Sequence, residues 1–150
     1  MDSSIISLKL TDQATKQMLQ NLVDRKLKFD RLKQRHIFLL WVSVLYSFTC
    51  LYFLYYFILE PYSYSFADIF SIIVGENNHL FFLFIAIGTF GATKVLYEKK
   101  EKAEKEYHDL RCEIIDRSKD LWKNEAWNSR NSVFEMMKEK YNINLYHESK

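Results

Sequence analysis

The feature that most constrains the fold is an uncharged run from Ile37 to Leu59, IFLLWVSVLYSFTCLYFLYYFIL. Arg35 and His36 precede this run, and Glu60 and Pro61 follow it. With a rise of about 1.5 Å per residue, a helix of this length extends roughly 34 Å, which is enough to cross a hydrocarbon core of ~30 Å. The run therefore predicts a transmembrane helix at residues 37–59.

A cleaved signal peptide is the main alternative for this run. Residues 1–36 precede it, and its length exceeds the roughly 7–15 apolar residues of a signal-peptide core. Tyr55, Tyr56 and Phe57 occupy the zone where a cleavage site would need small residues. We expect the segment to remain in the mature protein as a membrane anchor.

Composition indicates an almost wholly helical protein. The chain has 49% hydrophobic and 27% charged residues, so an apolar middle is flanked by charge-dense arms. One proline and three glycines are too few for the turns of a sandwich or barrel. Cys50 lies in the apolar run and Cys112 in a charged segment, so we expect no disulfide between them.

A second apolar run, at residues 80–97, predicts a second transmembrane helix. Its one charged residue, Lys94, lies about one turn from the end, where its ammonium group can extend to the lipid headgroups. Residues 60–79 between the spans contain no Lys or Arg, whereas basic residues are dense before the first span and after the second. The positive-inside rule therefore predicts a two-pass protein of the cell membrane with both termini in the cytoplasm.

The loop at 60–79 is predicted to lie at the outer surface of the membrane. Tyrosines cluster at the outer end of the first span, as in an aromatic belt, and residues 66–74 are long enough only for a short interfacial helix. Asn78 is a candidate N-cap for the second span. Glu76 and His79 lack a third ligand in the sequence, so we expect ordinary polar residues there and no metal site.

Small residues suggest how the two spans pack, because close backbone approach stabilises helix pairs in lipid. One face of the first span carries Ser43, Ser47 and Cys50, and one face of the second carries Gly88, Gly91 and Ala92. We expect the two faces to meet within the hairpin. Dimerisation through the glycine face is the alternative, since small-xxx-small motifs also pair helices between chains.

The two cytoplasmic arms, at 1–36 and 98–123, are predicted to be helical and to pair with each other. Apolar residues recur at near-heptad spacing in both arms, and Glu-first i,i+4 ion pairs support the second arm. Pairing within one chain is the simpler expectation, and pairing between protomers is the alternative. The candidate interaction surface of this region consists of Tyr107, Leu110, Ile114, Leu121, Trp122 and Trp127.

Residues 124–150 form a separate C-terminal segment in which asparagines interrupt the charged pattern. Ser132 and Glu135 have the spacing of a capping box, and an apolar face follows, which predicts a short amphipathic helix near 132–141. Trp122 and Trp127 are expected to anchor this helix, either by packing on the arms or by contacting a membrane or a partner. The tail from Asn142 to Lys150 has no assigned structure.

The sequence contains no motif that indicates catalysis. P-loop, G-x-G-x-x-G, G-x-S-x-G, H-E-x-x-H and C-x-x-C patterns are absent, and the four histidines are scattered. We therefore expect a protein that is not an enzyme and has no catalytic, cofactor-binding or metal-binding residues. Basic residues are tied to the membrane flanks and interleaved with acids, so a nucleic-acid partner is not expected.

The run DLRCEIIDRSKDLW from Asp109 to Trp122 and the closing KNEAWNSRNSVFEMMKEKYNINLYHESK resemble the YpbF family of small bacterial two-span membrane proteins. The resemblance covers nearly the whole chain and implies a bacterial plasma membrane. That family has no established activity, so it implies no functional residues.

Together these patterns predict an all-α integral membrane protein: a two-span transmembrane helical hairpin, extended by coiled-coil-like cytoplasmic arms and a short C-terminal amphipathic helix. The leading functional hypothesis is a non-enzymatic structural or interaction protein whose cytoplasmic helices bind a protein partner or a second copy. The alternative is an oligomeric pore or transporter accessory subunit lined by Ser43, Ser47, Thr49, Thr89 and Thr93 hydroxyls.

Overall fold

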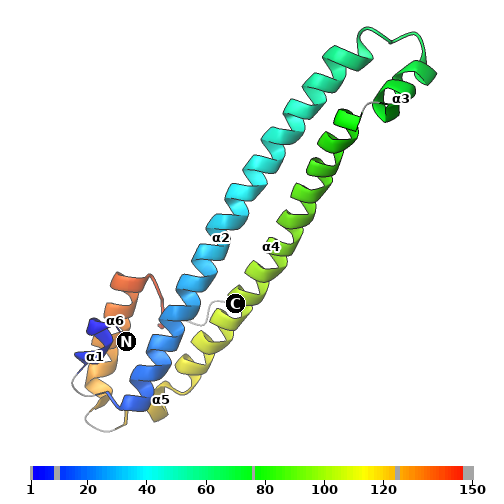
Figure 1. Ribbon diagram of the computed structural model, residues 1–150. Coiled ribbons are helices and arrows are strands. Elements are labelled where there is room, and N and C mark those ends of the chain that lie inside the picture. Colours follow the sequence, from blue (N-terminus) through cyan, green and yellow to red (C-terminus); the bar gives the residue numbers. More distant parts are fainter. Residues whose placement is uncertain (1, 9–10, 76, 124–125, 147–150) are drawn as a thin grey trace. The chain divides into compact units, whose positions relative to one another are not determined.

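The computed structural model describes residues 2–8, 11–75, 77–123 and 126–146 (Figure 1). All of the regular structure in these ranges is helical, and none of it is strand, as the composition predicts. The elements in chain order are α1 (Ser3–Ile6), α2 (Gln13–Leu54), the π-helix η1 (Tyr55–Leu59), α3 (Phe66–Gly75), α4 (Asn77–Asp116), α5 (Ser118–Leu121) and α6 (Trp127–Tyr141).

The chain divides into two compact units, and the long helices α2 and α4 contribute to both. One unit, called the terminal unit below, contains residues 1–32 and 100–150. The other, the apolar unit, contains residues 33–99. Each unit has its own chemistry and is described separately.

The terminal unit is built on a seam between the charged part of α2 and that of α4. The members of this seam recur at intervals of three, four and seven residues and are buried, as the sequence pattern predicts: Leu19, Leu22, Val23 and Phe29 of α2, and Ala103, Tyr107, Leu110 and Ile114 of α4. The Phe29 and Tyr107 rings stack with centroids 6.3 Å apart. The two arms therefore pair within one chain in this structure.

Polar contacts flank this seam. The Lys28 Nζ lies 3.1 Å from a carboxylate oxygen of Glu106, and the Arg25 guanidinium donates to the backbone carbonyl of Glu106 at 2.8 Å. Lys26 lies over both aromatic rings of the seam, at 5.3 Å from the Phe29 centroid and 5.5 Å from that of Tyr107. These contacts cover the edge of the stacked rings with charge and leave little of it open to water.

The sequence pattern predicts that the second arm runs as one helix to Trp122, but the structure breaks this helix. α4 ends at Asp116, Arg117 adopts φ −84° and ψ 4°, and the short helix α5 follows. The reason is packing: this break turns the chain so that Trp122 becomes fully buried beside Phe134, with the two rings edge to face at 5.6 Å. A straight helix would have carried Trp122 along the arm.

The C-terminal helix is longer than the sequence predicted. α6 begins at Trp127, so Ser132 and Glu135 lie inside the helix, and Ser132 is not its N-cap. The predicted start at 132 was wrong because the polar residues 128–132, which are exposed or half-buried, form the first turns of the helix and are not part of a preceding loop. Val133, Phe134 and Met137 form the buried face of α6.

Both chain ends complete the core of the terminal unit. Ile5 of α1 is fully buried, and Asp2 caps α1 by accepting a hydrogen bond from the Ser4 N–H at 3.2 Å. At the other end, Asn142 adopts the left-handed conformation with φ 54°, which asparagine tolerates better than most residues. This turn directs Ile143 and Leu145 back into the core.

The apolar unit contains α3, η1 and the apolar parts of α2 and α4, and Figure 1 shows those parts of α2 and α4 running side by side. Among the described residues, two helices are long and apolar enough to cross a membrane, Gln13–Leu59 and Asn78–Asp116. Only 6% and 0% of their most apolar stretches are buried inside the structure. Phe, Leu and Tyr side chains therefore cover the outside of this unit.

Helices in this unit begin and end where the sequence provides a reason. The apolar helix ends after η1 because Pro61 lacks an N–H and restricts the residue before it. α3 occupies the expected short helix in the loop and contacts η1. α4 begins at Asn77, one residue before the Asn78 that the sequence suggested as its cap.

Candidate functional site

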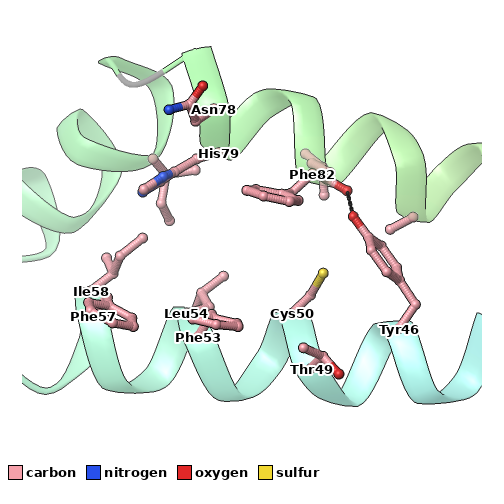
Figure 2. A pocket seen from close by; sticks show the side chains of 13 residues that line it. Tyr46, Thr49, Cys50, Phe53, Leu54, Phe57, Ile58, Asn78, His79 and Phe82 are labelled. Carbon is pink, nitrogen blue, oxygen red and sulfur yellow. Dashed lines mark hydrogen bonds between the residues drawn. The ribbon is translucent and has the colours of Figure 1, made fainter.

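The apolar unit contains a partly open cavity of about 460 Å³, lined by residues of α2, η1, α3 and the first turns of α4. Figure 2 shows its walls: one helix contributes Cys50, Phe53 and Leu54, and the facing helix contributes His79 and Phe82. Ile73 of α3 also lines it. The volume falls within the range of roughly 300–1,000 Å³ that small-molecule sites occupy.

The walls of this cavity are mostly hydrocarbon, and the hydroxyls on its surface are already bonded. The Tyr46 hydroxyl donates to the backbone carbonyl of Phe82 at 3.0 Å, the bond drawn in Figure 2. The Thr49 hydroxyl donates to the carbonyl of Leu45 in its own helix at 2.9 Å. These groups therefore hold the helices and have little capacity left for a ligand.

His79 differs from the other polar groups of the cavity. Its Nε2 is buried and has no hydrogen-bond partner among the residues that the structure describes. Asn78 lies beside it at the same end of the cavity (Figure 2). A buried nitrogen without a partner is costly, so this end of the cavity is where a polar atom of a ligand would be most favourable.

The π-helix η1 shapes the wall opposite His79. The Glu60 N–H donates to the Tyr55 carbonyl at 2.9 Å, a bond across five residues that inserts one extra residue into the turn. Ile58 lines the cavity and is buried, while its neighbour Phe57 lines the cavity only in part and is mostly exposed. Segments of π-helix occur frequently at functional sites in other proteins.

The predicted packing residues of the two apolar helices fall into two groups. Ser43 is buried, and its hydroxyl lies 3.2 Å from that of Thr93 on α4. Ser47 is half-buried and Cys50 lines the cavity. The first group therefore does face α4.

The second group does not face α2. Gly88, Gly91 and Ala92 are exposed, and a Cβ placed on either glycine would meet nothing within 4 Å. The contact face of α4 is formed instead by Ala86, Thr89 and Thr93, which are half-buried. The two predicted small-residue faces are thus not brought together within the chain.

Most of the predicted interaction surface lies in the core of the terminal unit. Tyr107, Leu110, Ile114 and Trp122 are buried there and cannot meet a partner without unfolding. Leu121 is half-buried and packs against that core. Of the six residues, Trp127 alone is exposed, at 41% of its full surface.

Trp127 belongs to a small exposed patch at the start of α6. The Arg130 guanidinium stacks over the Trp127 ring at 4.0 Å from its centroid. Tyr146 is also exposed, its hydroxyl donates to the Asn131 carbonyl at 3.1 Å, and its ring packs edge to face on Phe134. Trp127, Arg130 and Tyr146 are called the Trp127 patch below.

Charge in the terminal unit is arranged to hold its parts together. The Lys28 ammonium lowers the pKa of the Glu106 carboxyl, and burial raises the pKa of the neighbouring Tyr107 hydroxyl. The Tyr141 hydroxyl and the Ser4 N–H lower the pKa of Asp2. None of these groups lines the cavity of the apolar unit.

No three His, Cys, Asp or Glu side chains gather at a metal-binding distance within the described ranges. Cys50 and Cys112 are both free thiols. Glu76, which the sequence analysis considered beside His79, and His147 lie outside the described residues.

Sequence reasoning missed two residues that organise the terminal unit. Arg111 is buried, and its Nε donates to the Asn144 carbonyl at 2.6 Å, which fixes the C-terminal segment on α4. Asn142 ends α6 in the left-handed conformation. An asparagine followed by alternating apolar residues was the available signal for that turn and for the burial of Ile143 and Leu145.

Comparison with known proteins agrees with the resemblance noted in the sequence. Residues 18–148 match a family described as a protein of unknown function, DUF2663. The uncharacterized protein YpbF of Bacillus subtilis (strain 168) is 42% identical over 151 residues, which cover 95% of this chain and 94% of that protein. No solved structure matches the chain.

Proposed function

Since the chain belongs to the DUF2663 family of proteins of unknown function, we propose from its own residues that it is a non-enzymatic membrane protein that presents its terminal unit to a protein partner. In this proposal the helical segments 37–59 and 80–97 span the cell membrane. Both termini lie in the cytoplasm.

The observation that carries the proposal is the exposure of the two most apolar stretches. Only 6% and 0% of them are buried inside the structure, whereas the apolar helix of a water-soluble core would be mostly buried. A signal sequence would explain one such helix near the N-terminus, but α4 is a second one in the middle of the chain. Lipid is the solvent that suits both surfaces.

Charge supports the orientation. The sequence from Glu60 to His79 contains no Lys or Arg, while the residues before Ile37 and after Tyr97 are rich in them. Positively charged segments are retained on the cytoplasmic side during insertion. The loop with α3 is therefore assigned to the outer side, and the terminal unit to the cytoplasm.

The Trp127 patch is the proposed contact for a protein partner. Tryptophan, tyrosine and arginine contribute the largest share of binding free energy at many protein interfaces. The seam residues are committed to the core, so the exposed aromatic surface of the terminal unit is concentrated at this patch. A second copy of the chain is an alternative partner for the same surface.

The alternative of an oligomeric pore has weaker support. Ser43, Ser47, Thr49, Thr89 and Thr93 are the hydroxyl residues that would line it, and each donates a hydrogen bond to a backbone carbonyl three or four residues earlier in its own helix. Hydroxyls bonded in this way contribute less to a hydrated lining. Ion flux through liposomes containing the purified protein tests this alternative directly.

Single cysteines test the topology. In a background of Cys50→Ala and Cys112→Ser, Tyr64→Cys is expected to react with a membrane-impermeant maleimide on intact cells. Asp109→Cys is expected to react only after the cells are permeabilised. The opposite pattern would reverse the orientation, and release of the protein from membranes by alkaline carbonate would contradict membrane insertion altogether.

A photoreactive amino acid tests the partner surface. Placed at Trp127, it is expected to give one adduct of defined mass in cells, and placed at the exposed Lys119 of the same unit it is expected to give none. An adduct of twice the chain mass would identify the partner as a second copy. Equal patterns at both positions would contradict the proposed surface.

A further inference from the structure

We propose that the cavity of the apolar unit binds one long acyl chain, with an oxygen-bearing end group of the same molecule hydrogen-bonded to His79. This inference rests on the proposed membrane location. The chemistry is shared by two sources: a free long-chain fatty acid and an acyl chain with its ester group from a membrane phospholipid.

The walls determine the apolar part of the ligand. Phe53, Leu54 and Phe82 face the cavity from two helices, and its volume of about 460 Å³ is in the range of ligand sites. The cavity is partly open to the surroundings of the helices, so an acyl chain can enter it from the side. Water is a poor occupant because each molecule needs two to four polar partners, which these walls do not offer.

The polar part of the ligand follows from His79. Its buried Nε2 has no hydrogen-bond partner among the described residues, whereas the Tyr46 and Thr49 hydroxyls at the other end are bonded to backbone carbonyls. The available polar group is therefore at one end only (Figure 2). A molecule that matches has a long apolar body and a single polar end, such as a carboxyl or ester group.

The positions of the elements also fit an acyl lipid. His79 lies in the first turn of α4, next to the loop assigned to the outer membrane surface, and Cys50 and Thr49 lie deeper along α2. A lipid would thus keep its end group near the headgroup level while its chain extends between the helices. The π-helix η1 widens the wall on the side of Ile58, next to the same end.

Photolabelling of the full-length chain in lipid nanodiscs tests the proposal. Two probes carry the same mid-chain diazirine: a hexadecanoic acid, and a phosphatidylglycerol with that acid as one acyl chain. Adducts are mapped by mass spectrometry and are expected on Leu54 and Ile58, which line the cavity and are half-buried and buried. Labelling by one probe only identifies that source, and labelling by both shows that the site takes either.

Matched variants test the cavity itself. Ala86→Phe fills the cavity and is expected to abolish these adducts, whereas Ala92→Phe, on the exposed side of the same helix, is expected to leave them unchanged. Leu83→Trp provides a second filling variant if Ala86→Phe does not fold, as judged by circular dichroism. His79→Phe is expected to weaken binding of the probe about three- to tenfold, because one hydrogen bond is lost.

Three outcomes overturn the inference. Adducts confined to the exposed Phe81 and Phe84 would mean that lipid only surrounds the helices. Adducts unaffected by Ala86→Phe and Leu83→Trp would place the probe outside the cavity. Cross-links between copies through Cys50, together with absent labelling, would make the cavity a contact between chains.

Membrane extraction separates this inference from the proposed function. If alkaline carbonate leaves the wild-type protein in the membrane and the cavity is not labelled, only the lipid site fails. If carbonate releases the protein, the membrane location itself fails, and with it the basis of the lipid site.

Discussion

At the scale of single residues, Arg111 shows how a charged side chain can serve a hydrophobic core. The residue is only 4% exposed, and its Nε donates a hydrogen bond to the Asn144 carbonyl at 2.6 Å. The bond ties α4 to the segment that carries Ile143 and Leu145 into the core. Without it, the buried Arg111 guanidinium would lose an acceptor, and the segment that carries Ile143 and Leu145 would be less firmly held.

Arg111→Met is therefore expected to lower the free energy of unfolding of the terminal unit by about 1.5–3 kcal/mol, the usual contribution of a hydrogen bond to a charged group. Hydrogen exchange of the Ile143 and Leu145 amides measures the loss. Arg117→Met is the control, since Arg117 is exposed and its i,i+4 ion pair with Glu113, at 3.2 Å, joins two residues of the same arm. Arg117→Met should lower the free energy of unfolding by less than about 0.5 kcal/mol. Equal effects of both variants would contradict this role of Arg111.

At the scale of elements, α1 is a helix of four residues that tertiary contacts hold in place. The Asp2 N–H donates to Gln20 at 2.8 Å, the Lys16 ammonium to the Ile6 carbonyl at 2.9 Å, and the Lys140 ammonium to the Ser4 hydroxyl at 2.8 Å. A helix this short has no stability of its own in water. Its contribution must come from what it buries.

Ile5 and Ile6 make a matched pair for measuring that contribution, because they are adjacent, identical in type and exposed to 0% and 56%. Ile5→Ala is expected to destabilise the terminal unit by about 2–5 kcal/mol, and Ile6→Ala by less than about 0.5 kcal/mol. Hydrogen exchange in the buried part of α6 reports both. Similar values for the two variants would mean that α1 does not pack as the structure has it.

The ion pair between α2 and α4 predicts a dependence on acid. The Lys28 ammonium holds the pKa of Glu106 below its ordinary value of 4.5, so the folded protein binds this proton more weakly than the unfolded chain. The pair therefore stabilises the terminal unit above that value, and the stabilisation is lost as the pH falls through the folded pKa. Lys28 is exposed and Glu106 is about one-third exposed, so the effect is small at high salt.

Glu106→Gln and Lys28→Met each remove the Lys28–Glu106 ion pair. Both are expected to flatten the pH dependence of thermal stability below about pH 4.5. Melting temperatures measured between neutral and acidic pH at low salt provide the comparison. Lys28→Met should flatten the profile less than Glu106→Gln, because Lys102 and Arg25 still lower the pKa of Glu106 in that variant. Profiles identical to the wild type would show that other carboxyls dominate acid unfolding.

Elements with a regular apolar pattern could be predicted from the sequence, and the others could not. The spacing of Leu19, Leu22 and Ile114 predicts the seam because burial follows the helical period. The break at Arg117 was missed because Glu113 and Arg117 favour a continuous helix, and only the burial of Trp122 requires the break. The short helix α1 has only the N-cap Asp2 as a local signal, and four residues are too few to show an apolar period.

The candidate site was harder to predict for a related reason. Which side of α4 faces α2 depends on the rotation of the helix, and the structure turns Thr93 inward and Gly88 outward. The cavity depends on η1 and on the side-chain positions of Phe82 and His79, none of which has a sequence period. Small residues indicate where helices can approach closely, and they do not determine which neighbour they approach.

At the scale of the whole molecule, the two units differ in what stabilises them. The terminal unit has a buried core with Leu, Ile and Trp side chains, as expected for a structure in water. The apolar unit has few buried side chains, and its helices are held by contacts such as the Ser43–Thr93 hydroxyl pair at 3.2 Å. Hydrophobic stabilisation by buried side chains therefore acts mainly within the terminal unit, and the apolar unit has few buried side chains that could stabilise it in this way.

This difference predicts that the terminal unit unfolds without the apolar unit. Ile114→Ala, in the fully buried seam, is expected to destabilise residues 1–32 and 100–150 by about 2–5 kcal/mol. In nanodiscs, hydrogen exchange should become faster across those residues and stay unchanged in 37–59 and 80–97. Ile115→Ala is the control, since Ile115 is only partly buried at the same point of α4. Faster exchange throughout the chain would show instead that α2 and α4 unfold as single cooperative helices.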